Sequence, residues 1–223
     1  MLKFYFNASP NPTKVALFLE ESGLPYEAIA VDTRAGQQFA PDFLKINPNG
    51  KVPAIVDGAT TMFDSNAILL YLAEKAGKFL PRPDARAEML SWLMFVASGV
   101  GPYTGQAVHF KHFAAEKIPY ATDRYLFEAR RHFHVLDERL SHRRYVVGDT
   151  YTIVDMDVWG WARMIPFVLG DDAWASLPHL KRLHDEIDER PAAARAKGLK
   201  DRYPFKAELD AEARRYLFKH TTA

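Results

Sequence analysis

The sequence of 223 residues contains no cysteine. This absence excludes structural disulfides, metal sites built on thiolates, and any mechanism that uses a cysteine nucleophile. Any thiol chemistry of this protein must therefore use a thiol that another molecule brings.

Long hydrophobic runs and an excess of one charge are also missing. No stretch reaches the ~18 apolar residues that a membrane-spanning helix needs, and the N-terminal residues 1–6 lack the features of a signal peptide. With 29 basic and 28 acidic side chains, no overall field would attract nucleic acid or an anionic membrane. We therefore expect a cytoplasmic protein without nucleic-acid or membrane partners.

Residues 1–80 alternate between strand-like and helix-like patterns. The patterns predict elements in the order β-α-β-α-β-β-α, which are residues 2–6, 13–22, 26–31, 41–46, the two strands of a hairpin over 51–63, and 65–76. Gly23 and Gly77 end the two longer helices, and Asp57-Gly58 supplies the hairpin turn. This order predicts a small α/β domain.

Strand patterns stop at a proline-bearing linker near residues 78–84, and residues 85–223 look entirely helical. Helices are predicted over 85–100, 123–140, 152–165 and 177–190. The first of them should bend near Gly99, Gly101 and Pro102. Thr152 and Asp155 have the spacing of a capping box, which places the start of the third.

Val52-Pro53 opens the predicted third strand, where proline forfeits one hydrogen bond of the ladder. Only about 5% of X-Pro bonds in folded proteins are cis, so base rates favour the trans form. The order of elements resembles that of thioredoxin-like domains, in which a proline corner exposes the preceding backbone to an extended thiol peptide. The sequence leaves the isomer open.

Asp64-Ser65 stands at the start of the predicted helix over 65–76. A serine there is most often a simple N-cap, which stabilises a helix by about 1 kcal/mol. The open N–H groups of a helix start also favour an anion, while a neighbouring carboxylate favours an ammonium group. The pair is therefore suited either to capping or to holding a free α-amino acid group.

Histidines offer little evidence for a metal site. His109 and His112 lie three residues apart on a predicted helix, but no third ligand accompanies them, so we expect no metal. Large apolar side chains at other notable positions are expected to build the core, and these are Tyr5, Trp159, Trp161 and Met164.

Two segments, "NPNGKVPAIVD" and "FDSNAILLYLAEK", precede a proline-bearing linker and an all-helical half that contains "YTIVDMDVWGW". Together they resemble the cytosolic glutathione transferase family. Segments such as "YFNASPNPTKVALFLEE" and "GQAVHFKHF" are similar to its Nu-class branch, whose members include glutathione-dependent disulfide-bond oxidoreductases. The resemblance covers residues 1–195 and implies a thioredoxin-like α/β domain (1–80) followed by an all-α domain (85–223). It gives no match for the tail from Lys197 onward.

The resemblance implies that glutathione is the cosubstrate and that a defined set of residues binds it: Gln38, Lys51, Val52, Pro53, Asp64, Ser65 and Arg131. Val52 would pair its backbone with the cysteinyl part of glutathione, and Asp64 with Ser65 would hold the γ-glutamyl group. The family usually has glutamate at the position of Asp64. Where this branch directs a threonine and an asparagine toward the glutathione sulfur, the chain has Ser9 and Asn11.

A homodimeric enzyme that reduces disulfides is the function that the resemblance implies. Ser9, Asn11 and the N-terminus of a helix expected to start at Pro12 would favour the thiolate of bound glutathione. Transfer of the thiolate to an aromatic or ether carbon, and non-catalytic glutathione binding by a regulator, are alternatives, and Ser9 with Asn11 could serve only the turn. The substrate pocket is expected near Tyr103, Gln106, His109 and Phe110.

Overall fold

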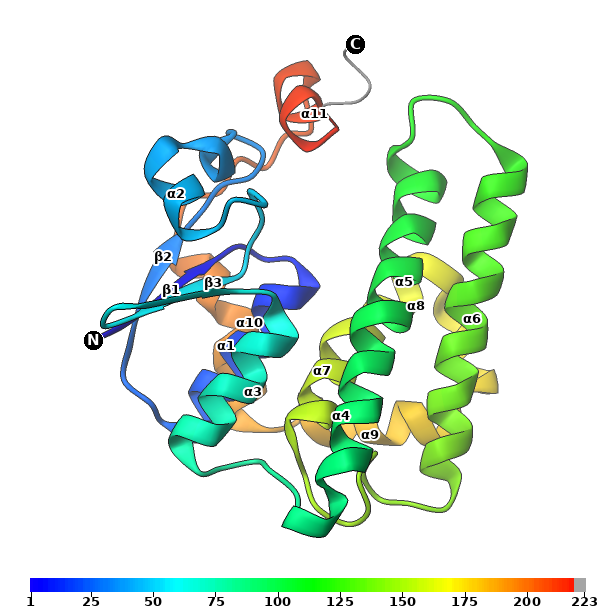
Figure 1. Cartoon of the computed structure of the whole chain (residues 1–223). Coiled ribbons are helices and arrows are strands. Elements are labelled where there is room, and N and C mark those ends of the chain that lie inside the picture. Colours follow the sequence, from blue (N-terminus) through cyan, green and yellow to red (C-terminus); the bar gives the residue numbers. More distant parts are fainter. Residues whose placement is uncertain (219–223) are drawn as a thin grey trace. The chain divides into compact units, whose positions relative to one another are not determined.

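The computed structural model describes residues 1–218 (Figure 1). The chain forms two compact units: residues Met1–Ala76 together with the segment from Pro191 onward, and residues Gly77–Arg190. Among residues 1–218, no helix combines the length and the apolar character that crossing a membrane requires.

The first unit contains the predicted β-α-β-α-β-β-α order. Its elements are β1 (Leu2–Phe6), α1 (Pro10–Ser22), β2 (Tyr26–Ala30), a 3-10 turn (Gln37–Phe39), α2 (Pro41–Ile46), β3 (Ala54–Asp57), β4 (Thr60–Phe63) and α3 (Ser65–Ala76). Gly23 ends α1 in the left-handed conformation, as predicted. The third strand begins at Ala54 rather than at Val52, so the Val52-Pro53 corner lies before the strand.

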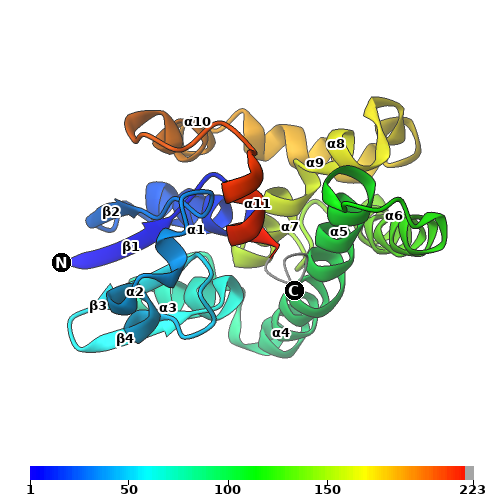
Figure 2. The ribbon, with the colours of Figure 1, turned by 90° about the horizontal axis from the view of Figure 1, so that it is seen from above.

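The four strands form a mixed sheet in the order β2-β1-β3-β4. β1 runs parallel to β2 and antiparallel to β3, with Phe4 opposite Ala28 on one side and Ile55 on the other. Side chains alternate along β1, so Phe4 is fully buried while Tyr5 faces the other side and packs on Phe43 of α2 at 5.7 Å. In Figures 1 and 2, α1 and α3 lie on one face of the sheet and α2 lies on the other.

The C-terminal segment differs from the expected division at residues 85–223. Its elements are α10 (Pro191–Gly198), a 3-10 turn (Leu199–Arg202) and α11 (Ala211–Leu217), and all of them belong to the first unit. α10 packs beside α1 because its buried face of small residues, Ala192, Ala193 and Ala196, lets the two helices approach closely. The expectation placed this segment in the helical domain over residues 85–223, whereas its contacts group it with the first unit.

The second unit is helical throughout, as predicted. Its helices are α4 (Arg86–Phe95), α5 (Gly101–Val108), α6 (Pro119–Ser141), α7 (Ile153–Ala162), α8 (Ile165–Leu169) and α9 (Pro178–Asp188), with short 3-10 turns at Pro83–Ala85 and Asp171–Ser176. The predicted bend takes the form of a π-helical stretch over Val96–Val100, and a second π-helical stretch over His109–Phe113 was not predicted.

A capping box starts α7, as the sequence predicted. The backbone N–H of Thr152 donates to Oδ2 of Asp155 at 2.8 Å, and the Thr152 hydroxyl accepts from the N–H of Val154 at 3.3 Å. With its start held in this way, α7 buries both Trp159 and Trp161 in the core of the unit.

Candidate functional site

The first turn of α1 exposes a single residue with free hydrogen-bond donors. α1 begins at Pro10, not at Pro12 as predicted, because Ser9 is the N-cap and its carbonyl accepts from the N–H of Thr13 at 3.2 Å. Pro10 and Pro12 have no N–H group to offer. Among residues 1–218, the backbone N–H and the carboxamide of Asn11 have no hydrogen-bond partner.

Ser9 is held by Asn7 in the turn before α1. Its backbone N–H and its hydroxyl both donate to Oδ1 of Asn7, at 2.9 and 2.6 Å. The carboxamide of Asn7 in turn donates to the Thr33 hydroxyl at 3.1 Å. Asn7 was not among the predicted site residues, although asparagine is a common turn residue that bonds the backbone two positions on.

The Val52-Pro53 bond is cis. Among the described residues, the backbone N–H and carbonyl of Val52 have no hydrogen-bond partner, so both can pair with an extended peptide. Asn47, which the sequence analysis missed, is buried and holds this loop. Its carboxamide donates to the carbonyl of Lys51 at 2.6 Å and accepts from the N–H of Asn49 at 3.0 Å.

Asp64, rather than Ser65, caps α3. Oδ1 of Asp64 accepts from the N–H groups of Asn66 at 2.9 Å and Ala67 at 3.1 Å, and its carbonyl accepts from the N–H of Ile68 at 2.9 Å. Ser65 is the first helical residue and therefore cannot be the cap that base rates favoured.

The geometry of Asp64 leaves groups available for a ligand. Asp64 adopts φ of +68°, a left-handed conformation that aspartate tolerates better than most residues. Its Oδ2 has no hydrogen-bond partner among the described residues. The backbone N–H of Ser65 also has no hydrogen-bond partner among the described residues, and the buried Ser65 hydroxyl makes only a long 3.4 Å contact with Asn66. A carboxylate oxygen thus stands beside a donor pair at a helix start.

These groups meet in one cavity of about 150 Å³ in the first unit. Six predicted residues line it, namely Asn11, Lys51, Val52, Pro53, Asp64 and Ser65, and they are joined by Asn47, Asn49 and Phe63. Ser9 and Gln38 are not among the lining residues. Gln38 is a buried residue of the 3-10 turn over Gln37–Phe39. Its amide donates to the Thr33 carbonyl at 3.2 Å, and its Oε1 has no partner among residues 1–218.

The remaining predicted residues belong to the second unit. Arg131 on α6 donates to Glu128 at 2.9 Å, and this hydrogen bond holds the pKa of the Glu128 carboxyl below its usual range. The residues expected to line a substrate pocket lie on α5 and the π-helical stretch after it, and they are Tyr103, Gln106, His109 and Phe110. Their roles, like that of Arg131, stay predictions.

His112, the other histidine weighed as a metal ligand, has a structural contact. Its Nε2 lies 2.9 Å from the carbonyl of Phe167, and its ring stacks on Phe167 at 4.1 Å. Within residues 1–218, no group of three or more His, Asp or Glu side chains gathers where a metal ion could be held.

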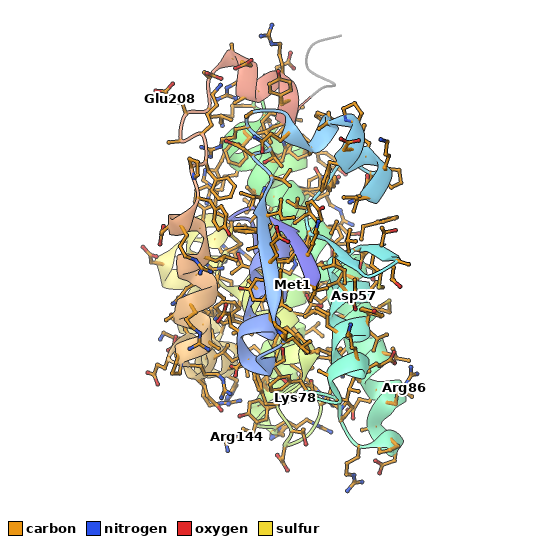
Figure 3. The ribbon with its side chains drawn as sticks, turned by 90° about the vertical axis from the view of Figure 1, so that its left-hand side faces the viewer. Met1, Asp57, Lys78, Arg86, Arg144 and Glu208 are labelled. Atoms are coloured by element: carbon orange, nitrogen blue, oxygen red, sulfur yellow. The ribbon has the colours of Figure 1, made fainter. Side chains whose placement is uncertain are left out.

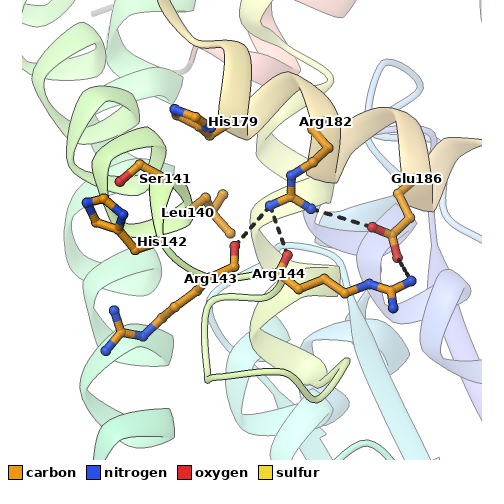
Figure 4. Close-up of a pocket in the computed structure, with 8 residues that line it drawn as sticks. All are labelled: Leu140, Ser141, His142, Arg143, Arg144, His179, Arg182 and Glu186. Atoms are coloured by element: carbon orange, nitrogen blue, oxygen red, sulfur yellow. Dashed lines mark hydrogen bonds and ion pairs between the residues drawn. The ribbon is translucent and has the colours of Figure 1, made fainter.

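A larger hollow of about 470 Å³ lies between the end of α6 and α9 in the second unit (Figure 4). Arg182 donates to the carbonyls of Arg143 and Arg144, both at 3.0 Å, and Glu186 pairs with Arg144 at 3.1 Å. In Figure 4 the guanidinium of Arg143 points away from that of Arg182. Because these charged groups tie the segment to α9 and do not converge, we assign no ligand to this hollow.

Comparisons with known proteins agree with the first unit's geometry. A profile described as "Glutathione S-transferase, N-terminal domain" matches residues 8–75, and one described as "Glutathione S-transferase, C-terminal domain" matches residues 105–191. The chain is 42% identical over 211 residues to disulfide-bond oxidoreductase YfcG of Escherichia coli (strain K12), with 88% of this chain and 94% of the relative covered. The chain belongs to the glutathione S-transferase family.

Other known proteins are similarly related to the chain. Disulfide-bond oxidoreductase YghU of the same E. coli strain is 39% identical, with 88% of this chain and 74% of the relative covered. A glutathione transferase from Burkholderia graminis, crystallised with two glutathione molecules per subunit, has a TM-score of 0.86 and 36% identity, with 91% of this chain and 89% of that chain covered. A Pseudomonas putida transferase with one bound glutathione disulfide has a TM-score of 0.83 and 35% identity, over 88% and 90% of the two chains.

The residues of the first unit fit the chemistry of glutathione. The ligand's α-ammonium group needs an acceptor such as Oδ2 of Asp64, and its α-carboxylate needs donors such as the N–H and hydroxyl of Ser65. The cavity is smaller than the ~300 Å³ at which ligand pockets usually begin, so we expect it to take one end of the tripeptide and leave the rest along Val52. The prediction of glutathione as cosubstrate therefore agrees with both the relatives and the local geometry.

Proposed function

We propose that this protein is a glutathione-dependent disulfide-bond reductase. The observation that carries the proposal is the unpartnered donor set of Asn11, which lines the same cavity as the free backbone of Val52 in a chain without cysteine. A protein that reduces disulfides without its own thiol needs a bound thiol and donors that stabilise it as a thiolate.

Four residues of the cavity bind glutathione directly in this scheme. Asp64 binds the α-ammonium group of glutathione through Oδ2, and Ser65 binds the α-carboxylate. Val52 pairs its N–H and carbonyl with the cysteinyl residue, as an added strand would. Asn11 then directs its N–H groups at the sulfur.

The bound glutathione supplies a thiolate that attacks one disulfide sulfur and displaces the other as a thiolate, and a second glutathione completes the reduction to glutathione disulfide. A free thiol with a pKa near 8.5 is mostly protonated at neutral pH. Each unit by which the donors lower this pKa requires about 1.4 kcal/mol of preference for the charged form. Two hydrogen bonds to a charged acceptor, at about 1.5–3 kcal/mol each, are enough for a shift of that size.

The names of the relatives support reduction over conjugation. Two E. coli proteins at 42% and 39% identity are named disulfide-bond oxidoreductases, and a structural neighbour was crystallised with glutathione disulfide. The same thiolate could attack an electrophilic carbon, so activity on an aryl chloride is the outcome that would favour a transferase or lyase.

The test is a paired assay in the wild-type protein. Glutathione-dependent reduction of hydroxyethyl disulfide is measured beside conjugation of an activated aryl chloride. We expect the first activity to dominate. Dominant conjugation would replace the proposal with a transferase, and tight glutathione binding without either activity would replace it with a non-catalytic binder.

The proposal also includes the oligomeric state, the substrate pocket and the cellular compartment of the protein. We expect a cytoplasmic homodimer, whose substrate pocket includes Tyr103, Gln106, His109 and Phe110, with Arg131 directed at glutathione. Exposed large apolar side chains, including Met94 at 48% and Phe127 at 60% exposure, are consistent with a buried subunit interface. Light scattering of the purified protein measures the oligomeric state.

A further inference from the structure

The C-terminal segment over residues 203–217 follows the edge of the sheet in the first unit. The Tyr203 hydroxyl donates to the carbonyl of Ala28 in edge strand β2 at 3.0 Å, and the Tyr203 ring packs edge-on against Phe6 at 5.3 Å. Figures 1 and 2 show the segment running from α10 to α11 across this unit. It therefore supplies a hydrogen-bond donor to one carbonyl of edge strand β2.

The same segment then forms hydrogen bonds and packing contacts with the loop over residues 31–38. Oδ2 of Asp32 accepts from the backbone N–H of Lys206 at 2.6 Å, and the Arg34 guanidinium donates to the Lys206 carbonyl at 3.3 Å. The Tyr216 ring of α11 lies against Gly36, where an added Cβ would come within 2.6 Å of the ring. Only glycine at position 36, with φ of +78°, allows this approach.

The other side of this loop contacts the candidate site. Oδ1 of Asp32 accepts from the N–H of Arg34 at 2.9 Å and shapes the loop. The Thr33 hydroxyl accepts from the carboxamide of Asn7, whose Oδ1 holds the N–H of Ser9 immediately before α1. Lys206 is thus connected to the start of α1 by hydrogen bonds at Asp32, Thr33 and Asn7, with the Asp32-Thr33 peptide bond as the covalent step between them.

We infer that residues 203–217 form a strap that positions the sulfur-directed donors of the site. The strap fixes the loop through Asp32, the Thr33 hydroxyl sets the orientation of the Asn7 carboxamide, and Asn7 sets the turn that presents Asn11. Asp32, Thr33 and Asn7 are positioning residues, since none of them lines the cavity. The inference rests on the proposed function for the meaning of the donors, but the positioning itself is a property of the ligand-free protein.

If the strap positions the donors, its loss should change the turnover number and the affinity for glutathione to different extents. In the proposed function, Val52, Asp64 and Ser65 hold the peptide part of glutathione. Among the described residues, these three make no hydrogen bond with the strap. Loosening the connection from Lys206 to α1 should therefore lower kcat, because the donors are misplaced, and leave the KM for glutathione nearly unchanged.

Three substitutions test the hydrogen bonds of Thr33 and Asp32 one at a time. Thr33→Val keeps the volume and removes the acceptor for Asn7, and Thr33→Ser restores the hydroxyl. Asp32→Asn keeps an oxygen for the Arg34 N–H and loses the acceptor for Lys206. Glu208→Gln is the matched control, because Glu208 lies on the same segment, is exposed, and points away from the protein (Figure 3).

Amide hydrogen exchange of residues 7–13 in the ligand-free protein is the first measurement, followed by kcat and KM. We expect exchange to become about tenfold faster in Thr33→Val and Asp32→Asn, with kcat about tenfold lower, and wild-type values in Thr33→Ser and Glu208→Gln.

Unchanged exchange in Thr33→Val overturns the strap, whatever the activity. Equal effects of Thr33→Val and Thr33→Ser also overturn it, because the hydroxyl would then not be the link. Faster exchange in a protein whose wild type reduces no disulfide supports the strap and refutes the proposed function, so the two failures are distinguishable.

Discussion

The Ser9 hydroxyl donates to Oδ1 of Asn7 at 2.6 Å, and the same oxygen accepts from the Ser9 backbone N–H. A hydroxyl has one proton, so Ser9 must leave Asn7 before it can donate to a ligand sulfur. Asn11 has no competing partner among the described residues. The two predicted donors are therefore unequal, and Asn11 should carry more of the thiolate stabilisation.

Substitutions at these two positions test that inequality. We expect Asn11→Ala to lower kcat for hydroxyethyl disulfide reduction by about 10- to 100-fold, because a hydrogen bond to a charged group is lost. Ser9→Ala should lower it by less than about threefold, since breaking the Asn7 bond offsets the gain from the sulfur. Steady-state kinetics at saturating glutathione measure both, and a larger effect of Ser9→Ala would reverse the assignment.

Asp64 combines a helix cap with a charge for the ligand, and two substitutions separate these roles. Asp64→Asn keeps the Oδ1 acceptor and tolerance of the left-handed conformation, so the unfolding free energy should change by less than about 0.5 kcal/mol. Glutathione affinity should fall about tenfold or more because the charge-assisted contact is lost. Calorimetric titration measures the affinity.

Asp64→Ala removes the cap as well and should also lower the unfolding free energy by about 1–2 kcal/mol. Wild-type glutathione affinity in Asp64→Asn would show that Oδ2 does not hold the ammonium group.

Asn47 positions the loop that presents Val52. The buried Asn47 carboxamide donates to the Lys51 carbonyl and accepts from the Asn49 N–H. Because Asn47→Ala leaves these two groups without their partner, it should destabilise the protein by about 1–3 kcal/mol. Asn47→Asp keeps the acceptor and loses the donor, so its glutathione affinity should also fall. Urea unfolding and calorimetry check both variants, and unaltered affinity in Asn47→Asp would remove the loop contact from the binding scheme.

Asp57 at the hairpin turn should make stability depend on acid pH. Hydrogen bonds from Lys75 and Tyr71 lower the pKa of its carboxyl. A lowered pKa means that the stabilising contribution is present above the unfolded-state pKa of about 3.9 and is lost as pH falls through the folded-state value. The stability difference between wild type and Asp57→Asn should thus be full near about pH 6 and shrink below about pH 4.

Urea unfolding across this pH range measures the difference. Asp42→Asn serves as the control, because Asp42 and Lys45 are exposed and their pair is screened by solvent. A difference that stays constant with pH would contradict the role of Asp57.

Local patterns in the sequence were enough to predict most elements of the first unit. Strand alternation and the helix-ending Gly23 and Gly77 are signals within a few residues of the elements that they define. The start of α1 was misplaced because Pro10 and Pro12 are both allowed in a first helical turn. The cap of α3 was misassigned because Asp64 and Ser65 are both good capping residues, and only backbone geometry separates them.

Long-range contacts explain what the sequence analysis missed. Lys206 and Asp32 meet although they lie 174 positions apart, and nothing near either residue predicts the pairing. The link from Asn7 to Thr33 spans 26 positions and is equally invisible to local patterns. The cavity residues Lys51, Val52, Asp64 and Ser65 were predictable because the family resemblance covers their motifs.

The thiol pKa of bound glutathione tests most directly whether this cysteine-free chain works through a borrowed thiolate. Ultraviolet absorbance of the thiolate, titrated with pH, measures this pKa in the wild type and in Asn11→Ala, and the chain has no thiol of its own to interfere. We predict a pKa at least about one unit below that of free glutathione in the wild type, and a return toward the free value in Asn11→Ala. A bound thiol with the pKa of free glutathione, or an equal pKa in the two proteins, would contradict the role of Asn11 as thiolate donor.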